Sequence, residues 1–407
     1  MNGTLERVRN SWIRAQLKSP PVVQGTILTC LHEAKEIVRL LAQPYVPACQ
    51  WQGRGPGGLL TATYVGLGYS TTFLKGMLFD KDEDPVEQPA GRIPFWRLGE
   101  MADRTSSDVV IVEAASRLIR RLPDRQSIIF PQHVEHVADV RGDWEDVQSR
   151  FHKTVRRLSL KLVRKCGYGY DVSTDRRDFE EFYQRMYAPT TEERHDKRSM
   201  PISIGEAYQY FRCGWLLRVK RDGEWVAGAL MHPWQDVLIA DMSGVRDADA
   251  QLTHEGAVVA IYYYSLQLAN QRGYTGVNFL GSGPVLQGGL FQHKRRWGGT
   301  IILSPYLHRL LWLSVRRSTP AVTQFLKETP LVTVGEDGRL HGLIIVDDPY
   351  QVPPEVEQEW EKNYATPGLG SLIVRAAGTF TGEPGAVQVP DRVVPLSAGT
   401  RMEMDDD

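Results

Sequence analysis

The sequence predicts an α/β (α+β) fold in which mixed, mostly antiparallel sheets are flanked by helices. Three closely spaced apolar segments have the character of strands, and an amphipathic helix and a further short strand follow them. These segments are residues 215–220, 225–231, 237–242, 255–272 and 275–279. Asp222 and Gly223 join the first two strands, and Asp-Gly is the strongest short signal for a hairpin. We therefore expect an antiparallel meander that leads into a strand–loop–helix–strand unit.

The length of the chain predicts two domains with additional segments, since 407 residues exceed one ordinary domain. We expect an N-terminal α/β domain, a better defined second domain, a C-terminal extension of a helix and a hairpin, and a loose acidic tail. These parts are residues 1–145, 146–304, 305–378 and 379–407. No apolar run approaches the roughly 18 residues of a membrane span, and residues 1–20 lack the apolar stretch of a secretory signal. This predicts a cytoplasmic location.

Charge and cysteine content limit the ligands that the chain is expected to bind. The formal net charge of −1 argues against DNA binding over the whole surface, so any site for a polyanion is local. The four cysteines are scattered and form no C-x-x-C pair. This predicts reduced thiols, with neither a metal site nor a disulfide framework.

The first domain is expected to form a small α/β unit. A helix is predicted first, then a glycine-rich surface loop before a strand, and then two further strands with a short helix between them. The corresponding residues are 22–41, 53–58, 59–65, 109–112 and 127–130. A diverged copy of the strand–loop–helix–strand unit within residues 59–140 is compatible with this order.

The second domain begins with a helix that carries a strong positive charge. Residues 150–165 include seven basic residues and no acidic one. An apolar stripe at helical spacing is expected to pack against the core. The stripe consists of Phe151, Val155, Leu158 and Leu162. The cationic face is either a solvated surface or a binding surface for a phosphate-bearing substrate or an RNA acceptor stem, with an anionic membrane as a third alternative.

Further elements follow the basic helix. Asp178 is expected to cap a helix, and a polar loop is expected before a second short helix. After residue 305 the pattern predicts an amphipathic helix and then a hairpin. The loop, the short helix, the amphipathic helix and the hairpin are residues 190–199, 205–212, 306–315 and 332–346.

Two segments resemble motifs of a known superfamily. The basic residues of 156–167 lead into a strand, and residues 289–299 are similar to an aromatic-x-x-Lys-x-x-aromatic-Gly ending. Together with the meander and the long helix, they resemble the acyltransferase fold of the GNAT superfamily in its tandem, Fem-like (FemAB-type) form. The resemblance covers about residues 146–303. It implies that Lys294 is the functional lysine of the family, with Trp297 in place of the more usual Phe.

The resemblance implies acyl transfer to an amine-bearing metabolite, peptide or cell-envelope precursor. The donor is acyl-CoA or aminoacyl-tRNA as a co-substrate, with no tightly bound cofactor, so tRNA is a possible partner. Members that use coenzyme A bind its pyrophosphate at a Gln/Arg-x-x-Gly-x-Gly/Ala loop. Here Gln251 and Gly256 fit that loop, but His254 replaces the first glycine, and a side chain there hinders close approach of phosphate. The acceptor and the oligomeric state stay open.

Acyl transfer needs a deprotonated amine and a stabilised oxyanion. We expect Lys294 to stabilise the oxyanion and Asp241 or Glu255 to act as the base. A lysine in a basic turn, a solvent-facing Asp and a Glu that complements a helix dipole are the alternative interpretations. Further candidates for binding the substrate or donor are Arg156, Arg157, Lys161, Gln251, His254, Gly256, Tyr263 and Asn278. The rival function is a non-catalytic protein that binds an anionic partner through its basic helix.

Overall fold

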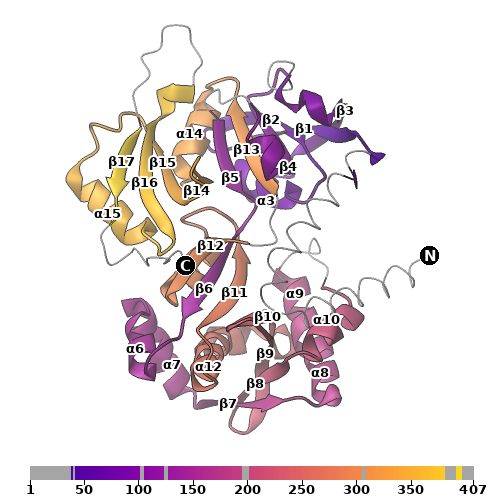
Figure 1. Ribbon diagram of the computed structural model, residues 1–407, viewed down its shortest axis with the longest axis vertical. Helices are drawn as coiled ribbons and strands as arrows, with labels where there is room; N and C mark the ends of the chain where they lie inside the picture. The colour runs from indigo at the N-terminus through magenta and orange to yellow at the C-terminus, as the bar shows by residue number, and fades with distance from the viewer. Residues whose placement is uncertain are drawn as a thin grey trace. The chain divides into compact units, whose positions relative to one another are not determined.

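The computed structural model describes residues 38–39, 42–100, 105–122, 127–194, 201–304, 309–380 and 391–396. The described chain forms two compact units (Figure 1). Unit 1 contains residues 135–280 and 293–300, and unit 2 contains the other described residues up to 134, residues 281–292 and those from 301 onward. The sheets are mixed and mostly antiparallel, which confirms the fold class predicted from the sequence. Most of the predicted helix at residues 22–41 lies outside the described residues.

A seven-stranded sheet forms the centre of unit 1, in the order β12-β6-β11-β10-β9-β8-β7. Its strands are β6 (Val134–Asp139), β7 (Tyr168–Ser173), β8 (Trp215–Arg221), β9 (Glu224–Trp234), β10 (Val237–Val245), β11 (Gly276–Ser282) and β12 (Gly299–Leu303). The antiparallel meander β8-β9-β10 is confirmed. Asp222 and Gly223 have φ values of 51° and 84°, and these positive angles are the ones that a tight hairpin turn requires.

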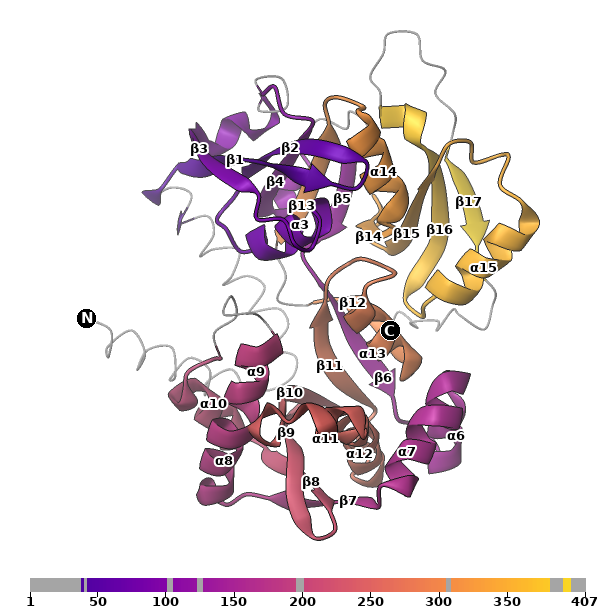
Figure 2. The ribbon, with the colours of Figure 1, turned by 180° about the vertical axis from the view of Figure 1, so that it is seen from behind.

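Helices cover both faces of this sheet (Figure 2). Neighbouring residues of a strand point to opposite faces, so Leu216 and Leu217 belong to different cores. Leu217 packs with α12 (Ala257–Gln271), whereas Leu216 packs with α8 (Arg176–Phe182) and α10 (Ile204–Phe211). The two apolar layers hold the central strands in fixed positions.

The predicted long helix is α12, and both of its ends match the sequence. Gly256 precedes it with φ 98°, and Gly273 follows it with φ 74°. Both glycines occupy the left-handed region, which side chains other than glycine rarely adopt. Ala257, Ala260 and Ile261 are buried against the sheet, so the apolar stripe faces the core as expected.

The basic helix differs from the prediction because it contains a π-helical turn. The segment comprises α6 (Trp144–Ser149), the π turn η2 (Val155–Ser159) and α7 (Leu160–Lys165). The π turn adds one residue to the repeat and rotates everything that follows. Leu160 is therefore buried, and Leu158 is 66% exposed. The stripe predicted from regular helical spacing was correct for Phe151 and Val155 and wrong for Leu158.

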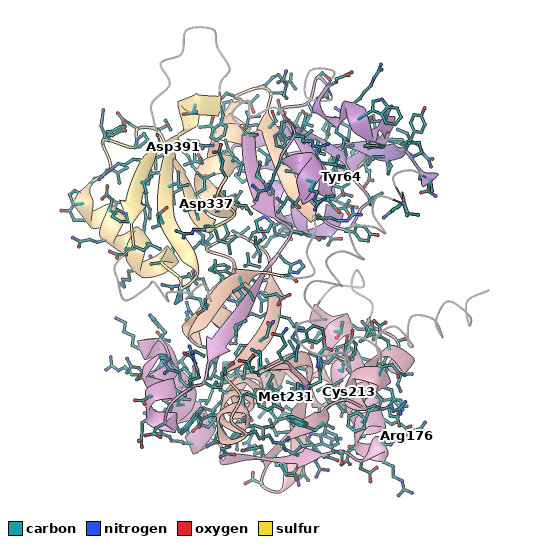
Figure 3. All side chains as sticks on the ribbon, in the orientation of Figure 1. Tyr64, Arg176, Cys213, Met231, Asp337 and Asp391 are labelled. Carbon is teal, nitrogen blue, oxygen red and sulfur yellow. The ribbon has the colours of Figure 1, made fainter. Side chains whose placement is uncertain are left out.

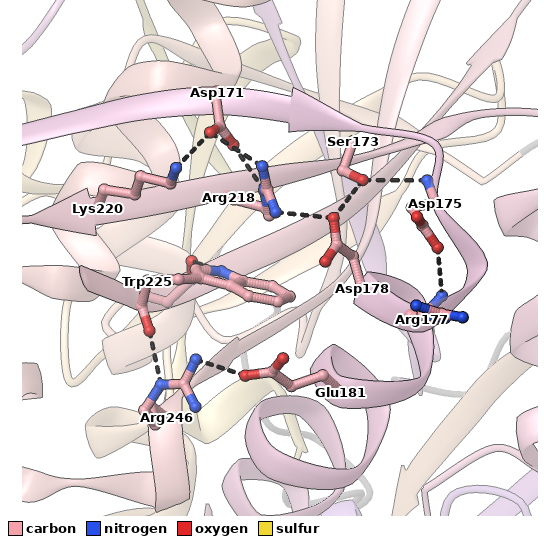
Figure 4. A network of polar contacts seen from close by, with 11 residues as sticks. Asp171, Ser173, Asp175, Arg177, Asp178, Glu181, Arg218, Lys220, Trp225 and Arg246 are labelled. Carbon is pink, nitrogen blue, oxygen red and sulfur yellow. Dashed lines mark hydrogen bonds and ion pairs between the residues drawn. The ribbon is translucent and has the colours of Figure 1, made fainter. Parts of the chain in front are cut away.

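Asp175, and not Asp178, caps helix α8. The Asp175 carboxylate accepts a 2.7 Å hydrogen bond from the backbone N–H of Arg177. Asp178 lies one turn later and accepts hydrogen bonds from Ser173 and Arg218 (Figure 4). These contacts join β7, β8 and α8. The polar loop expected over 190–199 was also partly wrong, because α9 (Ala188–Arg194) is helical.

Unit 2 contains a six-stranded sheet in the order β3-β1-β2-β4-β13-β5 and a four-stranded sheet in the order β14-β15-β16-β17. Tyr64 lies in the six-stranded sheet, and Asp337 lies at the four-stranded one (Figure 3). The strands are β1 (Tyr45–Gly55), β2 (Gly58–Val65), β3 (Val86–Pro94), β4 (Val109–Ala115), β5 (Ser127–Pro131), β13 (Arg309–Val315), β14 (Leu331–Val334), β15 (Leu340–Val346), β16 (Leu369–Ala376) and β17 (Arg392–Pro395).

Two predictions for the C-terminal part require correction. The amphipathic helix expected at residues 306–315 is strand β13, which lies between β4 and β5. Leu311 and Trp312 are buried on opposite faces, so a short apolar run that looks helical serves a fully buried strand. Strand β17 lies within the stretch expected to be a loose tail. The predicted hairpin of β14 and β15 is confirmed.

Within the described ranges, several α-helices of unit 2 flank these sheets. They are α3 (Thr71–Leu78), α5 (Ser116–Ile119), α14 (Pro320–Glu328) and α15 (Pro354–Tyr364). Each unit contains a short parallel pair of strands, namely β2 and β4 in unit 2 and β10 and β11 in unit 1, and unit 2 has a further parallel pair, β15 and β16. Among the helices in the described ranges, none is long and apolar enough to cross a membrane.

The π turn gives a stability test with a built-in control. Leu160→Ala removes a buried side chain and should lower the free energy of unfolding by about 2–5 kcal/mol. Leu158→Ala makes the same chemical change at an exposed position and should stay within about 0.5 kcal/mol of the wild type. Urea unfolding of both variants measures the difference. Equal losses, or a larger loss for Leu158, would contradict the burial set by the π turn.

Candidate functional site

The parallel strands β10 and β11 separate near the middle of unit 1. They are paired over only three positions, the last of which joins Ile239 to Asn278. Beyond that point β10 contains a β-bulge at Asp241, where the register with β9 shifts. An extra residue in one strand bends it and redirects a side chain. Two predicted site residues, Asp241 and Asn278, therefore lie where the two strands stop pairing.

Lys294 lies beside β11 in a buried polar cluster. Its side chain comes from α13 (Gly289–Arg296), the residue is 4% exposed, and its Nζ donates a 3.1 Å hydrogen bond to the carbonyl oxygen of Leu280. Asn278 donates a 2.7 Å hydrogen bond to the carboxylate of Glu135 on β6. Glu135 also interacts electrostatically with Lys294. The structure thus brings Lys294 and Asn278 together, with Glu135 as their shared acidic neighbour.

The backbone at Leu280 is shaped by both members of this cluster. Leu280 has φ 60°, which is uncommon for a residue other than glycine. Its N–H donates a 2.8 Å hydrogen bond to Oδ1 of Asn278, while its carbonyl accepts from Lys294. Unusual backbone conformations persist when surrounding contacts fix them, and they concentrate at functional sites. Asn278 and Lys294 therefore hold the strand in a bent shape where it leaves β10.

Burial controls the charge of this cluster. Desolvation lowers the pKa of Lys294 to about 7, although the nearby Glu135 carboxylate opposes the shift. Desolvation also lowers the pKa of His136 to about 3, and the positive charge of Lys294 adds to that effect. At neutral pH, His136 is therefore uncharged, while Lys294 is divided between its ammonium and its free amine. A group with such a pKa can both stabilise negative charge and exchange protons.

Asp241 has a histidine partner that the sequence did not suggest. His232 on β9 is 4% exposed, and its Nε2 lies 3.6 Å from Oδ2 of Asp241. The imidazole of His232 stacks on the ring of Tyr210, with 5.2 Å between the ring centroids. Asp241 lies two residues past the last paired position of β10, just as Leu280 does on β11. Asp241 with its histidine neighbour and the Leu280 carbonyl that accepts from Lys294 thus occupy corresponding positions on the two separating strands.

The segment compared with the coenzyme A loop, residues 251–256, is largely a short helix, α11 (Ala250–His254). The backbone N–H groups of Glu255 and Gly256 donate to carbonyls of the same turn, so neither is directed toward a ligand. The carboxylate of Glu255 is bonded to Arg221 and to Gln251, at 3.1 Å from the latter. The hydrogen bond from Gln251 is the largest of the contacts that lower its pKa. These contacts fit a structural role for Glu255.

We call Lys294, Asn278 and Glu135 the lysine cluster, and other predicted site residues lie apart from it. His254 is exposed on α11, and a Cβ added at Gly256 would approach Leu162 to 2.7 Å. Tyr263 packs against Trp144, with 5.4 Å between the ring centroids. The neighbouring Tyr262 contacts Phe279 of β11 instead, at 4.4 Å. Tyr262 is therefore the aromatic residue of this helix that borders the strand of the site.

The predicted cationic surface is present on η2 and α7. We call the exposed side chains of Lys153, Arg156, Arg157 and Lys161 the basic face. In the described ranges, no carboxylate forms an ion pair with any of these four. The pKa of the nearby His152 is lowered by burial first and then by a cluster of cations that includes Arg295, Arg296, Lys153 and Arg156. The exposed Leu158 lies within the same face.

Sequence reasoning missed three residues of the site, namely Glu135, His136 and His232. Glu135 and His136 follow an apolar residue in β6, and His232 follows seven apolar or small residues in β9. An ionisable residue inside a strand is unfavourable unless something compensates for it. That signal drew attention to Asp241, and it applies equally to these three positions.

No protein-family model and no curated protein matches the chain. Several solved structures do match. FemX is similar at 12% identity and a TM-score of 0.38, over 75% of this chain and 96% of that one. L-PGS from Bacillus licheniformis is similar at 12% identity and a TM-score of 0.32, over 67% and 85%. A tandem GNAT protein from the clavulanic acid biosynthesis pathway is similar at 11% identity and a TM-score of 0.27, over 69% and 87%. These likenesses concern the fold.

The buried lysine predicts a specific dependence of stability on pH. Between about pH 7 and the ordinary lysine value of 10.5, the unfolded chain binds a proton that the folded chain lacks. The stability contributed by Lys294 should therefore rise with pH in this window, by at most about 1.4 kcal/mol per pH unit. Denaturant unfolding from about pH 7.5 to about pH 9.5 should show this rise in the wild type and a smaller rise in Lys294→Met.

The exposed Lys153→Met variant controls for the loss of a lysine in general, since it removes a charge from the basic face. Parallel stability curves for the wild type and Lys294→Met across the whole window would contradict the shifted pKa of Lys294.

Proposed function

We propose that the protein transfers an acyl group to an amine at the lysine cluster of unit 1, with aminoacyl-tRNA as the donor. The observation that carries the proposal is the buried Lys294, whose amine lies at the separation of β10 and β11 and has a pKa of about 7. The match of residues 289–299 to the Fem-like motif supports the same residue. The acceptor is an amine-bearing metabolite, peptide or cell-envelope precursor.

The reaction joins the nitrogen of the acceptor to the carbonyl carbon of the acyl donor. The bond between that carbon and the ribose oxygen of the donor breaks, and an amide forms. The attacking nitrogen loses a proton, and the departing ribose oxygen gains one. The ammonium of Lys294 stabilises the negative charge that develops on the carbonyl oxygen, and Asp241 with His232 accepts the proton of the nitrogen.

Two features favour aminoacyl-tRNA over acyl-CoA as the donor. Coenzyme A needs backbone N–H groups for its pyrophosphate, whereas those of Glu255 and Gly256 are engaged within their own turn. By contrast, the basic face offers four exposed cations to the phosphates of an RNA. Aminoacyl-tRNA does not need a pocket shaped for coenzyme A.

Replacing Lys294 by Met tests its role in catalysis. Met keeps much of the side-chain volume but removes the charge, so the developing oxyanion loses its cationic partner. Turnover should fall by about a hundredfold to a thousandfold, which corresponds to roughly 3–4 kcal/mol of barrier. Steady-state aminoacyl transfer measures this, with the melting temperature as a check on folding. Full activity in a normally folded variant would exclude Lys294 from catalysis, and a rise in KM alone would assign it to substrate binding.

The donor is tested by ligand-induced stabilisation. A ligand that binds only the folded state raises the melting temperature by mass action. We expect deacylated tRNA to raise it and coenzyme A to leave it unchanged. Changing Arg156, Arg157 and Lys161 together to Gln should weaken tRNA binding and reduce its dependence on salt concentration. Stabilisation by coenzyme A would indicate acyl-CoA as the donor instead. If neither tRNA nor coenzyme A raises the melting temperature, the result would favour a binding protein without catalysis.

A matched control uses cations that lie elsewhere in unit 1. Arg176 and Arg185 are exposed and lie on α8 and on the π turn η3 (Tyr183–Tyr187), outside the sequence range of the basic face. Their joint change to Gln should leave tRNA affinity and its salt dependence close to those of the wild type. A loss equal to that of the basic-face variant would mean that RNA binds through general charge and not through this face.

A further inference from the structure

Unit 2 contains a cavity that the acyl-transfer chemistry does not use. Its volume is about 290 Å³, and it lies between the end of α14, strand β15 and helix α15. Figure 2 shows α15 lying along the four-stranded sheet. Its lining includes Ile344 and Val346 of β15 and Trp360 and Tyr364 of α15. All of these residues belong to unit 2, so the cavity is described independently of the lysine cluster.

Apolar and aromatic side chains line the cavity together with polar groups. Ile344 is 4% exposed, and Val346, Trp360 and Tyr364 pack against the same core cluster. Burial raises the pKa of the Tyr364 hydroxyl, which agrees with a site that is partly shielded from water. Aromatic rings supply a large apolar surface with a defined geometry. Such walls favour a ligand that has an aromatic or branched apolar body.

The rim of the cavity carries one charge of each sign. The Nζ of Lys327 lies 2.6 Å from Oδ1 of Asp347, and both residues line the cavity. The Lys327 side chain is 28% exposed, and that of Asp347 is 83% exposed. An ion pair so open to water contributes little to stability, so a ligand can replace its contacts at small cost. The two charges are then available to opposite charges on one molecule.

We propose that this cavity binds a free α-amino acid with an aromatic or branched apolar side chain. The carboxylate of the ligand binds Lys327, its ammonium binds Asp347, and its side chain lies between Ile344 and the rings of Trp360 and Tyr364. This arrangement leaves neither charge of the rim without a partner. A ligand with a single charge would leave one of them unpaired. The volume is near the lower limit of about 300 Å³ for ligand pockets, which suits one small molecule and excludes a nucleotide.

Calorimetric titration of the full chain with L-phenylalanine tests the proposal. We expect saturable binding, with weaker binding of 3-phenylpropanoate, which lacks the ammonium, and of phenethylamine and phenylalaninamide, which lack the carboxylate. L-Alanine tests the apolar contacts and should bind more weakly as well. The proposal is overturned if L-phenylalanine fails to saturate at concentrations on the order of 10 mM. Equal binding of 3-phenylpropanoate would also overturn it, since the ammonium would then be unrecognised.

Variants locate the binding in the cavity. Lys327→Met and Trp360→Ala should each weaken L-phenylalanine binding by about tenfold or more. Lys81→Met and Trp96→Ala make the same changes at exposed positions of unit 2 outside the cavity and should bind normally. If Trp360→Ala does not fold, Lys327→Met and Asp347→Asn test the location of the ligand. Each of these variants removes one charge at the rim of the cavity. Unchanged affinity in folded rim variants would place the ligand elsewhere. None of these residues belongs to the lysine cluster, so this result is separable from that for acyl transfer.

Discussion

The buried amine of Lys294 is the constraint on which the site in unit 1 depends. A lysine that is 4% exposed cannot be solvated by bulk water, and burial of an uncompensated charge costs several kcal/mol. The surrounding structure compensates with the carbonyl of Leu280 and the carboxylate of Glu135. Asn278 in turn binds Glu135 and holds Leu280 in a left-handed conformation. Strands β6 and β11 and helix α13 must all be in place before the amine acquires its pKa.

The same kind of side chain has the opposite role on the basic face. Lys161 and its neighbours are exposed and project into solvent, where each positive charge costs little. Their value lies in number and position, because several fixed cations attract a polyanion and release its counterions on binding. Burial sets the pKa and hence the proposed role of Lys294, whereas the basic face would attract a polyanion through the combined charge of several exposed side chains. The π turn contributes to this division, since it buries Leu160 and turns Leu158 and the adjacent cations outward.

Different residues lie at the end of the parallel strand pair β2–β4 in unit 2 and at the end of β10–β11 in unit 1. In unit 2, β4 continues past its pairing with β2 into Glu113, which is 2% exposed. The hydroxyl of Tyr64 donates a 2.5 Å hydrogen bond to Glu113, and the backbone N–H of Ser70 donates another at 3.1 Å. A Cβ at Gly66 would approach the Tyr64 hydroxyl to 2.4 Å, so this position is filled by the protein's own groups. In unit 1 the corresponding end carries the bulge at Asp241 and the buried Lys294.

The sequence by itself determined the elements whose signals are local. The hairpin at Asp222 and Gly223 and the ends of α12 at Gly256 and Gly273 follow from backbone angles that few residues can adopt. The positive charge of the basic helix also follows from the sequence alone. The motif at residues 289–299 was sufficient to select Lys294 as a candidate catalytic residue.

Only the tertiary structure decided the features that depend on contacts between distant segments. The π turn exposed Leu158, residues 309–315 became a strand of the six-stranded sheet, and residues 250–254 became helix α11. Glu135 reaches Asn278 although 143 positions separate them. Asp241 likewise gained His232 through the pairing of β9 with β10. Residue types and their spacing fix local conformation, but burial and the partner of each charge arise only when sheets and helices pack together.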